Sequence, residues 1–397
     1  MVSNGTRNQP SPRRDARILL LALGTFAIAT DYFVIAGVLK SLASDFAIRA
    51  ESAGQVVTAY AMTYAVSSPL LATATARSRR ERLVVTALAG FACMDLTCAL
   101  SQNIFVFAIA RVAAAGCAAI FIPGAYTLAA ALWPGKRRGT ALATVALGTT
   151  LAIVVGVPAG TSVAEVFGWR ATFALDACIG FAAAVLLAVR SIAPGTLQNR
   201  SISLAHSRLI GGYAIVLSIL ATLFWSAGTF SVYTYISMIF GDQLGLKNVT
   251  PLLTGYGLGA LAGSQSAGLL IDRFGPARPI IAAVMVSSVN FGLMAVTGGA
   301  VVSAAASLFI MAFCTWTALL AQQSRLLAID PEHGAIILSF LNSGIYLGAA
   351  MGAGIGGILI AAASRSAPLF GASCLMIAGL LVFLIASRQD QQACRPA

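Results

Sequence analysis

Long apolar stretches alternate with short polar connections along the whole chain. A helix needs about 20 mostly apolar residues to cross a bilayer. Twelve stretches approach or exceed that length: residues 18–39, 52–75, 83–100, 104–132, 140–164, 171–189, 209–238, 250–271, 279–298, 301–324, 335–362 and 367–387. The pattern predicts an all-α polytopic membrane protein with twelve transmembrane helices. It leaves no segment for a separate soluble domain.

Composition supports a membrane protein and excludes several other classes. Of the 397 residues, 58% are hydrophobic and only 10% are charged, whereas soluble domains carry about 25% charged residues. A water-soluble enzyme, a disordered chain and a secreted disulfide scaffold are therefore excluded. The seven cysteines show no spacing typical of metal ligands. We expect free thiols, no metal and no bound cofactor.

The basic residues predict how the chain is oriented. The net charge is +12, but these residues lie in short clusters between apolar stretches, so we expect no nucleic-acid partner. If the N-terminus is cytoplasmic, nineteen of the 25 Lys and Arg residues lie on the cytoplasmic side and five on the other. That asymmetry is the positive-inside pattern. We therefore predict that both termini face the cytoplasm.

The chain divides into two similar halves. The longest polar connection, residues 190–208, separates a six-helix half at 18–189 from a second at 209–387, with cytoplasmic tails at 1–17 and 388–397. Basic loops follow both the second and the eighth stretch, and the fifth and eleventh stretches are both rich in glycine. Two pseudo-symmetric halves that rock about a site in the middle of the membrane are typical of secondary transporters.

Three segments carry a family resemblance: Thr30–Gly37, Gly156–Gly160 with the following Trp169-Arg170, and Asn342–Gly348. They resemble the twelve-helix drug:proton antiporters of the major facilitator superfamily, which include arabinose, nucleoside and chloramphenicol exporters. The resemblance implies a monomer in the bacterial inner membrane that exports a small amphipathic or drug-like molecule in exchange for protons. An uptake symporter or facilitator of a small metabolite on the same fold is the first alternative, and a sensor that does not transport or a membrane enzyme is the second.

Charged residues within the apolar stretches are the best candidates for a mechanism, because each costs about 2.5–3.5 kcal/mol to insert. Asp31 and Arg111 lie roughly 12 and 10 Å below the outer ends of their helices at 1.5 Å of rise per residue. We predict that they meet and couple transport to protons; a static pair between helices is the alternative. Asp95 is a further candidate, and Asp176 lies close enough to a helix end to reach the interface.

The resemblance bears on this pair in two ways. Arg111 begins the segment Arg111–Gly116, which is similar to the fourth-helix motif linked to proton transfer in these antiporters. Family members usually carry a glutamate where this chain has Tyr32. Asp31 therefore has to act from the preceding position, which lies about 100° around the helix.

Small residues recur every four positions in three stretches, so each series lies on one helix face. The series are Gly148, Ala152, Gly156 and Gly160; Gly255, Gly259 and Gly263; and Gly344, Gly348, Gly352 and Gly356. Such faces allow close helix packing, and we expect them also to let the halves slide. Pro158 is expected to bend its helix. The resemblance of Gly156–Gly160 to a fifth-helix motif implies export.

A loop motif follows the eighth stretch and contains Gly268, Asp272, Arg273, Gly275 and Arg278. It is similar to the superfamily loop whose aspartate and arginines hold the outward-open state. In the first half Ala76 stands where the aspartate is expected, and Arg79 stands where the glycine is. The first copy is therefore expected to be weak, or to be an ordinary solvated basic loop.

Aromatic and amide side chains suggest a substrate cavity, because stacking suits an amphipathic solute. Packing within the membrane is the alternative interpretation. The candidates are Tyr32, Phe33, Phe224, Trp225, Tyr233, Asn290, Trp316 and Gln322. The sequence contains no phosphate-binding glycine loop, zinc motif or catalytic triad. We therefore expect no enzyme activity, and a proton gradient as the energy source.

Overall fold

The computed structural model describes residues 12–74, 79–133, 138–190, 212–241, 249–297, 301–330 and 334–393. Within these ranges the regular structure is helical throughout. The first half contains α1 (Pro12–Asp45), α2 (Ala50–Ala74), α3 (Arg80–Leu100), α4 (Ile104–Leu132), α5 (Arg138–Leu151), η2 (Ala152–Gly156), α6 (Val157–Phe167) and α7 (Trp169–Arg190). The second contains α8 (Tyr213–Tyr233), η4 (Ser237–Gly241), α9 (Thr250–Phe274), α10 (Ala277–Thr297), α11 (Val301–Ile329), α12 (Gly334–Ala362) and α13 (Ala367–Ala393).

Twelve helices of membrane-spanning length are present in the described ranges, because α5, η2 and α6 follow one another without a break. Ten of them also contain an 18-residue stretch apolar enough to cross a membrane. The other two, α2 and α9, carry more hydroxyl, amide and glycine residues. Both lie where the halves meet, so part of their surface faces protein rather than lipid. The expected polytopic all-α fold is confirmed.

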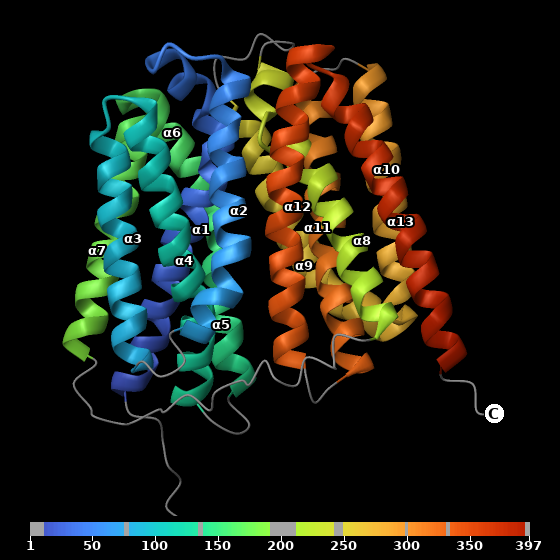
Figure 1. The fold of residues 1–397 in the computed structure, drawn as a ribbon, viewed down its shortest axis with the longest axis horizontal. Helices are drawn as coiled ribbons and strands as arrows, with labels where there is room; N and C mark the ends of the chain where they lie inside the picture. Colours follow the sequence, from blue (N-terminus) through green and yellow to red (C-terminus); the bar gives the residue numbers. More distant parts are fainter. Residues whose placement is uncertain are drawn as a thin grey trace, which may run out of the picture.

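The two halves stand side by side, with α1–α7 in blue to green and α8–α13 in yellow to red (Figure 1). The α2 helix packs against α12, and α9 packs against η2 and α6. The second helix of each half therefore meets the fifth helix of the other, as expected of two pseudo-symmetric halves. We call the end of the bundle at which α1 begins and α13 ends the inner end, and the opposite end the outer end.

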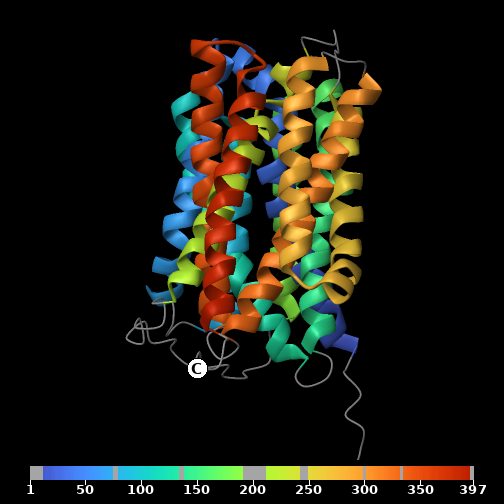
Figure 2. The same cartoon turned by 90° about the vertical axis from the view of Figure 1, so that its right-hand side faces the viewer.

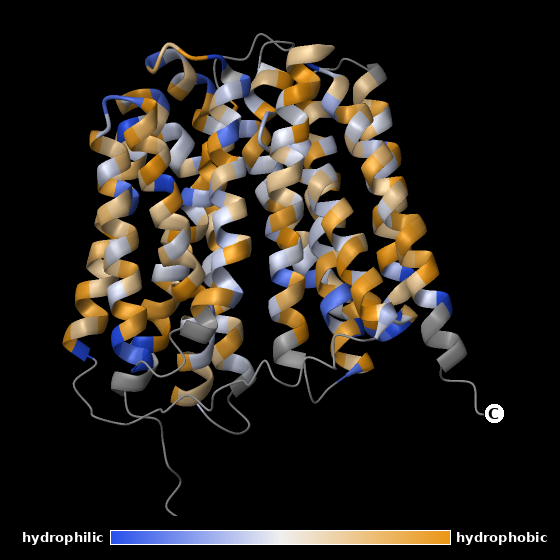
Figure 3. Ribbon diagram, in the orientation of Figure 1, coloured by the Kyte–Doolittle hydropathy of each residue, from blue (hydrophilic) through white to orange (hydrophobic). Residues whose placement is uncertain are grey.

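Polarity follows the helix axes. Most of the hydrophilic colour gathers at the two ends of the bundle, and apolar colours dominate the helices between these ends (Figure 3). A view turned by 90° shows the helices running between the same two ends (Figure 2). Large apolar side chains such as Leu100, Phe105 and Ile109 are more than two-thirds exposed. Exposed apolar side chains of this size are expected where lipid, rather than water, surrounds the protein.

The glycine stripe of the fifth helix packs against α1 in its own half. A Cβ atom on Gly148 would collide with the carbonyl oxygen of Ala22, and one on Gly156 would collide with the hydroxyl of Thr30. The wide π-helical turn η2 lies within this stripe and ends two residues before Pro158, the second residue of α6. Proline has no N–H to donate to the carbonyl four residues earlier, and the expected irregularity of this helix takes the form of the π turn.

The other two stripes also pack within one half. Gly255, Gly259 and Gly263 face the backbone of α11, and Gly344, Gly348, Gly352 and Gly356 face α8. The expectation that the stripes form sliding faces between halves is therefore wrong. Glycines on other helix faces lie at the contact between the two halves instead. A Cβ on Gly257 would lie 2.6 Å from the carbonyl oxygen of Ile153, and one on Gly357 would lie 3.1 Å from the amide nitrogen of Gln55.

Candidate functional site

A cluster of charged side chains is buried in the first half. Asp31 comes from α1, Asp95 from α3, Arg111 from α4 and Asp176 from α7, and each is at most 2% exposed. The Arg111 guanidinium donates a hydrogen bond to Asp31 Oδ1 and forms an ion pair with it. The structure thus brings together Asp31 and Arg111, the two residues that the sequence placed at similar depths below the outer ends of their helices.

Three carboxylates surround a single arginine in this cluster. Oxygen atoms of Asp31, Asp95 and Asp176 lie within 4.8 Å of one another. Among the described residues, Asp31 Oδ2, both oxygens of Asp95 and Asp176 Oδ2 are buried without a hydrogen-bond partner. One guanidinium cannot neutralise three carboxylates, and unpaired buried charges are costly. The arrangement therefore favours protons, or a cation, on the carboxyl groups.

Protons suit this cluster better than a divalent metal does. Ca²⁺ takes six to eight oxygen ligands and Mg²⁺ six in an octahedron, whereas the cluster brings together one ligand oxygen from each of three carboxyl groups. One of them, Asp31, already binds Arg111. The guanidinium bound to Asp31 would also repel the metal.

The expectation that Asp176 reaches the interface is wrong. It lies seven residues after the start of α7, but an aromatic cluster covers that helix end. The Trp169 ring lies 5.4 Å from the rings of both Phe46 and Phe107 and 5.8 Å from that of Phe173. These rings separate Asp176 from the outer end of the bundle, so its carboxyl group joins the buried cluster.

Aromatic side chains connect the charged cluster to the middle of the protein. The Arg111 guanidinium carbon lies 4.4 Å from the centre of the Tyr60 ring. That ring lies 5.3 Å from the ring of Tyr32, which in turn lies 5.7 Å from Phe230 and 5.4 Å from Tyr346 in the second half. A movement of Arg111 can therefore be transmitted to both halves through packed rings.

A cavity of about 580 Å³ lies between the halves. Its lining combines aromatic rings with hydroxyl and amide groups, and no Asp, Glu, Lys or Arg side chain belongs to it in the described part of the chain. Of the residues that the sequence suggested, Tyr32, Phe33, Trp225 and Trp316 line it. Such a mixture of apolar surface and a few neutral polar groups is typical of small-molecule sites.

The other suggested residues lie outside the lining. The amide of Asn290 donates to the carbonyl oxygen of Ser307 at 3.0 Å, and Gln322 donates to the carbonyl oxygen of Ser218 at 2.9 Å. Both amides are therefore used to join helices. Phe224 is partly buried on α8. Residues that the sequence did not suggest, including Thr229, Tyr256, Asn342 and Tyr346, take part in the lining.

The outer end of the cavity is closed by contacts between the halves. The Tyr233 hydroxyl, which lies outside the cavity lining, donates to the carbonyl oxygen of Phe33 at 2.9 Å. Thr250 donates to Glu165 at 3.2 Å. The lining extends in the other direction to Ala143 of α5 and Gln323 of α11, which lie five and six residues from the inner ends of their helices. The structure therefore represents an inward-facing state.

Tyr235 provides a test of this outer closure. Its hydroxyl donates to the carbonyl oxygen of Ala353 at 2.8 Å and lies against Gly54. A Gly54→Ala variant places a methyl group where that hydroxyl lies, so we expect the closure to weaken. A single cysteine in place of buried Leu253, which lies against Gly37 of the other half, should react faster with an impermeant maleimide added from outside in a background free of other cysteines.

The matched control for this experiment is Gly116→Ala, because a methyl group there meets nothing within 4 Å. It should leave the labelling rate unchanged. Equal rates in Gly54→Ala and the parent would show that Tyr235 does not hold the closed state.

The loop motif after the eighth span ends α9. Gly275 has a φ of +73°, a conformation that favours glycine, and its N–H bonds to the carbonyl oxygen of Ile271 at 2.8 Å. Asp272 and Arg273 are exposed, and Asp272 forms no ion pair with any residue that the structure describes. Its role in holding the outward-open state stays a prediction. Ala76 in the first copy lies outside the described residues.

Comparisons with known proteins agree with this architecture. The model of the Major Facilitator Superfamily matches residues 21–328. The chain is 29% identical over 381 residues to the uncharacterized MFS-type transporter YbcL of Bacillus subtilis, covering 95% of this chain and 97% of that protein. It is 35% identical over 269 residues to the chloramphenicol resistance protein of Streptomyces lividans, covering 64% of this chain and 67% of that protein.

The fold has a solved counterpart in a bacterial homologue of the human lysosomal transporter Spinster, in an inward-facing and unoccupied conformation. The TM-score is 0.72 at 17% identity, over 95% of this chain and 96% of that one. The twelve helices, their two-half arrangement and the central cavity define a membrane transporter of small molecules. The chain belongs to the Major Facilitator Superfamily.

Proposed function

We propose that this protein is a proton-coupled antiporter that exports a small, uncharged amphipathic molecule by alternating access. One observation carries the proposal. The buried group of Asp31, Asp95, Asp176 and Arg111 lies outside the central cavity but is joined to it through Tyr60 and Tyr32. A site that exchanges protons and a site for a solute are thus separate and in mechanical contact.

The inward-facing state, in this proposal, is the one from which the proton has left. Asp31 is then ionised and paired with Arg111. In the outward-facing state a proton on Asp31 breaks the pair, and Arg111 shifts relative to the Tyr60 ring on which it packs. Because that ring packs on Tyr32, the movement weakens the hold on the solute. Proton and solute each shift the same equilibrium between two states, which is the requirement for coupling.

The cavity lining supports an uncharged substrate. Its polar groups come from Ser, Thr, Tyr, Asn and Gln side chains, beside the rings of Trp225, Phe230 and Trp316. A charged solute would be transferred into this space without a countercharge, at a cost of several kcal/mol. The relative named as a chloramphenicol resistance protein is consistent with export of a drug-like solute, as is the fifth-helix motif.

The placement in the cell is part of the same proposal. We place the protein in the bacterial inner membrane as a monomer with both termini in the cytoplasm, because most basic loop residues then lie on the cytoplasmic side. The inward-facing cavity then opens to the cytoplasm. The proton gradient across that membrane supplies the energy.

Everted membrane vesicles test this function. They are energised to acidify their interior, and a panel of neutral drugs, nucleosides, sugars and cationic dyes is added while the pH gradient is followed. We expect a class of neutral amphipathic compounds to dissipate the gradient and the cationic dyes to have no effect. An Asp45→Asn variant is the control, because Asp45 forms its ion pair with Arg170 at the exposed outer end. Dissipation by cationic compounds alone would contradict the proposed substrate class.

A further inference from the structure

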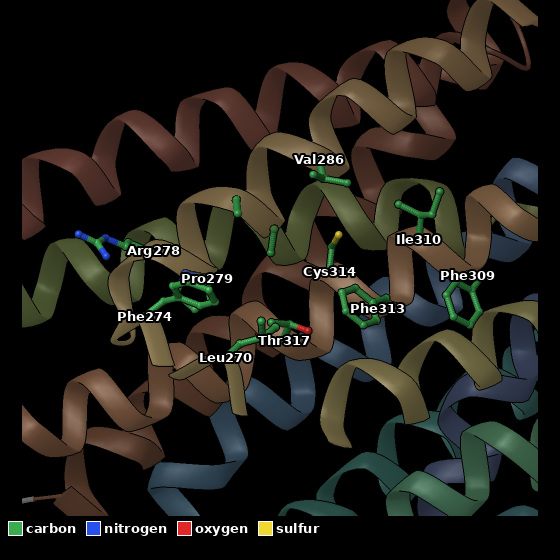
Figure 4. A pocket seen from close by; sticks show the side chains of 12 residues that line it. Leu270, Phe274, Arg278, Pro279, Val286, Phe309, Ile310, Phe313, Cys314 and Thr317 are labelled. Carbon is green, nitrogen blue, oxygen red and sulfur yellow. The ribbon is translucent and has the colours of Figure 1, made fainter. Parts of the chain in front are cut away.

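A second space opens on the membrane-facing side of the second half. It is a groove of about 490 Å³ between α9, α10 and α11, and its lining side chains are apolar apart from Arg278 and Thr317. The only charged lining residue, Arg278, lies at one end, and Phe309 lies at the other (Figure 4). Val286, Phe309 and Ile310 are between 37% and 48% exposed, so the groove faces lipid.

The groove and the central cavity share part of their walls. Ala283 of α10 and Cys314 of α11 line both spaces. With Ala318 and the ring of Phe313 they form a small apolar cluster that is separate from the main cores. The hydroxyl of Thr317, another groove residue, donates to the carbonyl oxygen of Gly263. The barrier between membrane and cavity therefore consists of the small side chains of Ala283, Cys314 and Ala318 with the ring of Phe313 beside them.

The groove begins at the inner end of the bundle and reaches past the middle of the membrane. Phe274 of α9 lies at its inner end, and Phe309 at its other end lies level with Gly259, about 22 Å farther along α9 at 1.5 Å per residue. With the orientation predicted by the basic loops, the groove therefore opens along the whole inner leaflet. Neutral amphipathic molecules concentrate in such a layer, whereas a charge in an apolar groove at this depth is costly.

We infer that this groove is a lateral entrance, through which an uncharged, membrane-dissolved molecule passes between α10 and α11 into the central cavity. The inference rests on the proposed substrate class but not on proton coupling. The argument for this occupant is the continuity of the groove with the cavity through Ala283 and Cys314. A phospholipid acyl chain that merely rests in the groove needs no such continuity.

Fluorescence quenching of Trp316, which lines the cavity, tests the entrance without any transport. The protein carries Trp316 as its only tryptophan, with Phe at positions 133, 169 and 225, and is reconstituted into lipid vesicles. The probe is bromododecane, a neutral quencher that resides in the bilayer. We expect it to quench Trp316 in the parent protein, and to quench it much less in Ala283→Leu, because the larger side chain fills the shared wall.

Two controls separate this effect from damage to the fold. Ala282→Leu enlarges a groove residue that does not line the cavity, so it should retain the parent's quenching by bromododecane. Acrylamide, which dissolves in water and enters through the inner mouth, should quench Trp316 equally in all three proteins. The smaller variant Ala283→Gly should be quenched at least as strongly as the parent.

Two results would overturn the inference. The first is equal quenching by bromododecane in Ala283→Leu and Ala282→Leu. The second is quenching by a phosphatidylcholine brominated on its acyl chains that is as strong as that by bromododecane, because the groove would then be a resting place for bilayer lipid. Neither result depends on pH gradients, so the antiport proposal can fail or stand independently.

Discussion

Replacing Arg111 with alanine is expected to destabilise the first half severely. The guanidinium is the only positive charge within reach of three buried carboxyl groups in the described structure. Removing one partner of a buried ion pair typically costs about 3–5 kcal/mol, and here it leaves Asp31, Asp95 and Asp176 together without a countercharge. We expect a large drop in melting temperature in detergent, together with loss of the monodisperse peak in size-exclusion chromatography.

A second substitution checks that charge is the cause. The double variant Arg111→Ala with Asp31→Asn removes both partners of the ion pair, so it should recover part of the lost stability. Asp45→Asn is the matched control, because the Arg170–Asp45 pair is about 40% exposed and such pairs contribute about 0–1 kcal/mol. A melting temperature of Arg111→Ala equal to that of the control would show that the carboxyl groups do not depend on Arg111.

Hydropathy and depth predict much of this structure because they depend only on distance along a helix. The twelve spans emerge from the length of the apolar stretches. The meeting of Asp31 and Arg111 follows from their similar distance to the outer helix ends. Both predictions use the rise per residue and need no knowledge of which helix packs against which.

The same rule fails for Asp176 because a helix end is not always in water. Trp169 at the start of α7 is only 3% exposed, since the rings of Phe46 and Phe107 cover it. Counting residues from the end of α7 therefore underestimates the depth of Asp176. The sequence contains the aromatic residues, but it does not show that they converge.

Periodicity identifies a helix face but not the neighbour that covers it. The stripe through Gly255, Gly259 and Gly263 was predictable, whereas its contact with α11 of the same half was not. Tyr60 was missed for a related reason. The sequence shows only that Tyr60 and Tyr64 are four positions apart and so share a face of α2. This spacing does not predict that the guanidinium of Arg111 lies over the Tyr60 ring.

Replacing Asp31 with asparagine is expected to abolish proton-driven export while leaving the cavity intact. The variant keeps a side chain of similar size beside Arg111 but cannot exchange a proton. Couplings between sites are typically worth 1–3 kcal/mol, or about 5- to 150-fold. The concentration gradient of the exported probe that vesicles sustain should therefore decrease by a factor in that range. Exchange of labelled for unlabelled probe without a pH gradient should continue, because the lining of the cavity does not include Asp31.

The other two carboxyl groups then decide how many protons move. Asp95 and Asp176 lie within 4.8 Å of Asp31, and Arg111 can neutralise only one carboxylate at a time. If they bind transported protons, Asp95→Asn and Asp176→Asn should lower the ratio of protons to exported probe, measured from paired pH and flux recordings, without abolishing coupling. Asp45→Asn should leave the ratio unchanged. Ratios equal to the parent's in both cluster variants would assign coupling to Asp31 alone, and full coupling in Asp31→Asn would remove the Asp31–Arg111 pair from the mechanism.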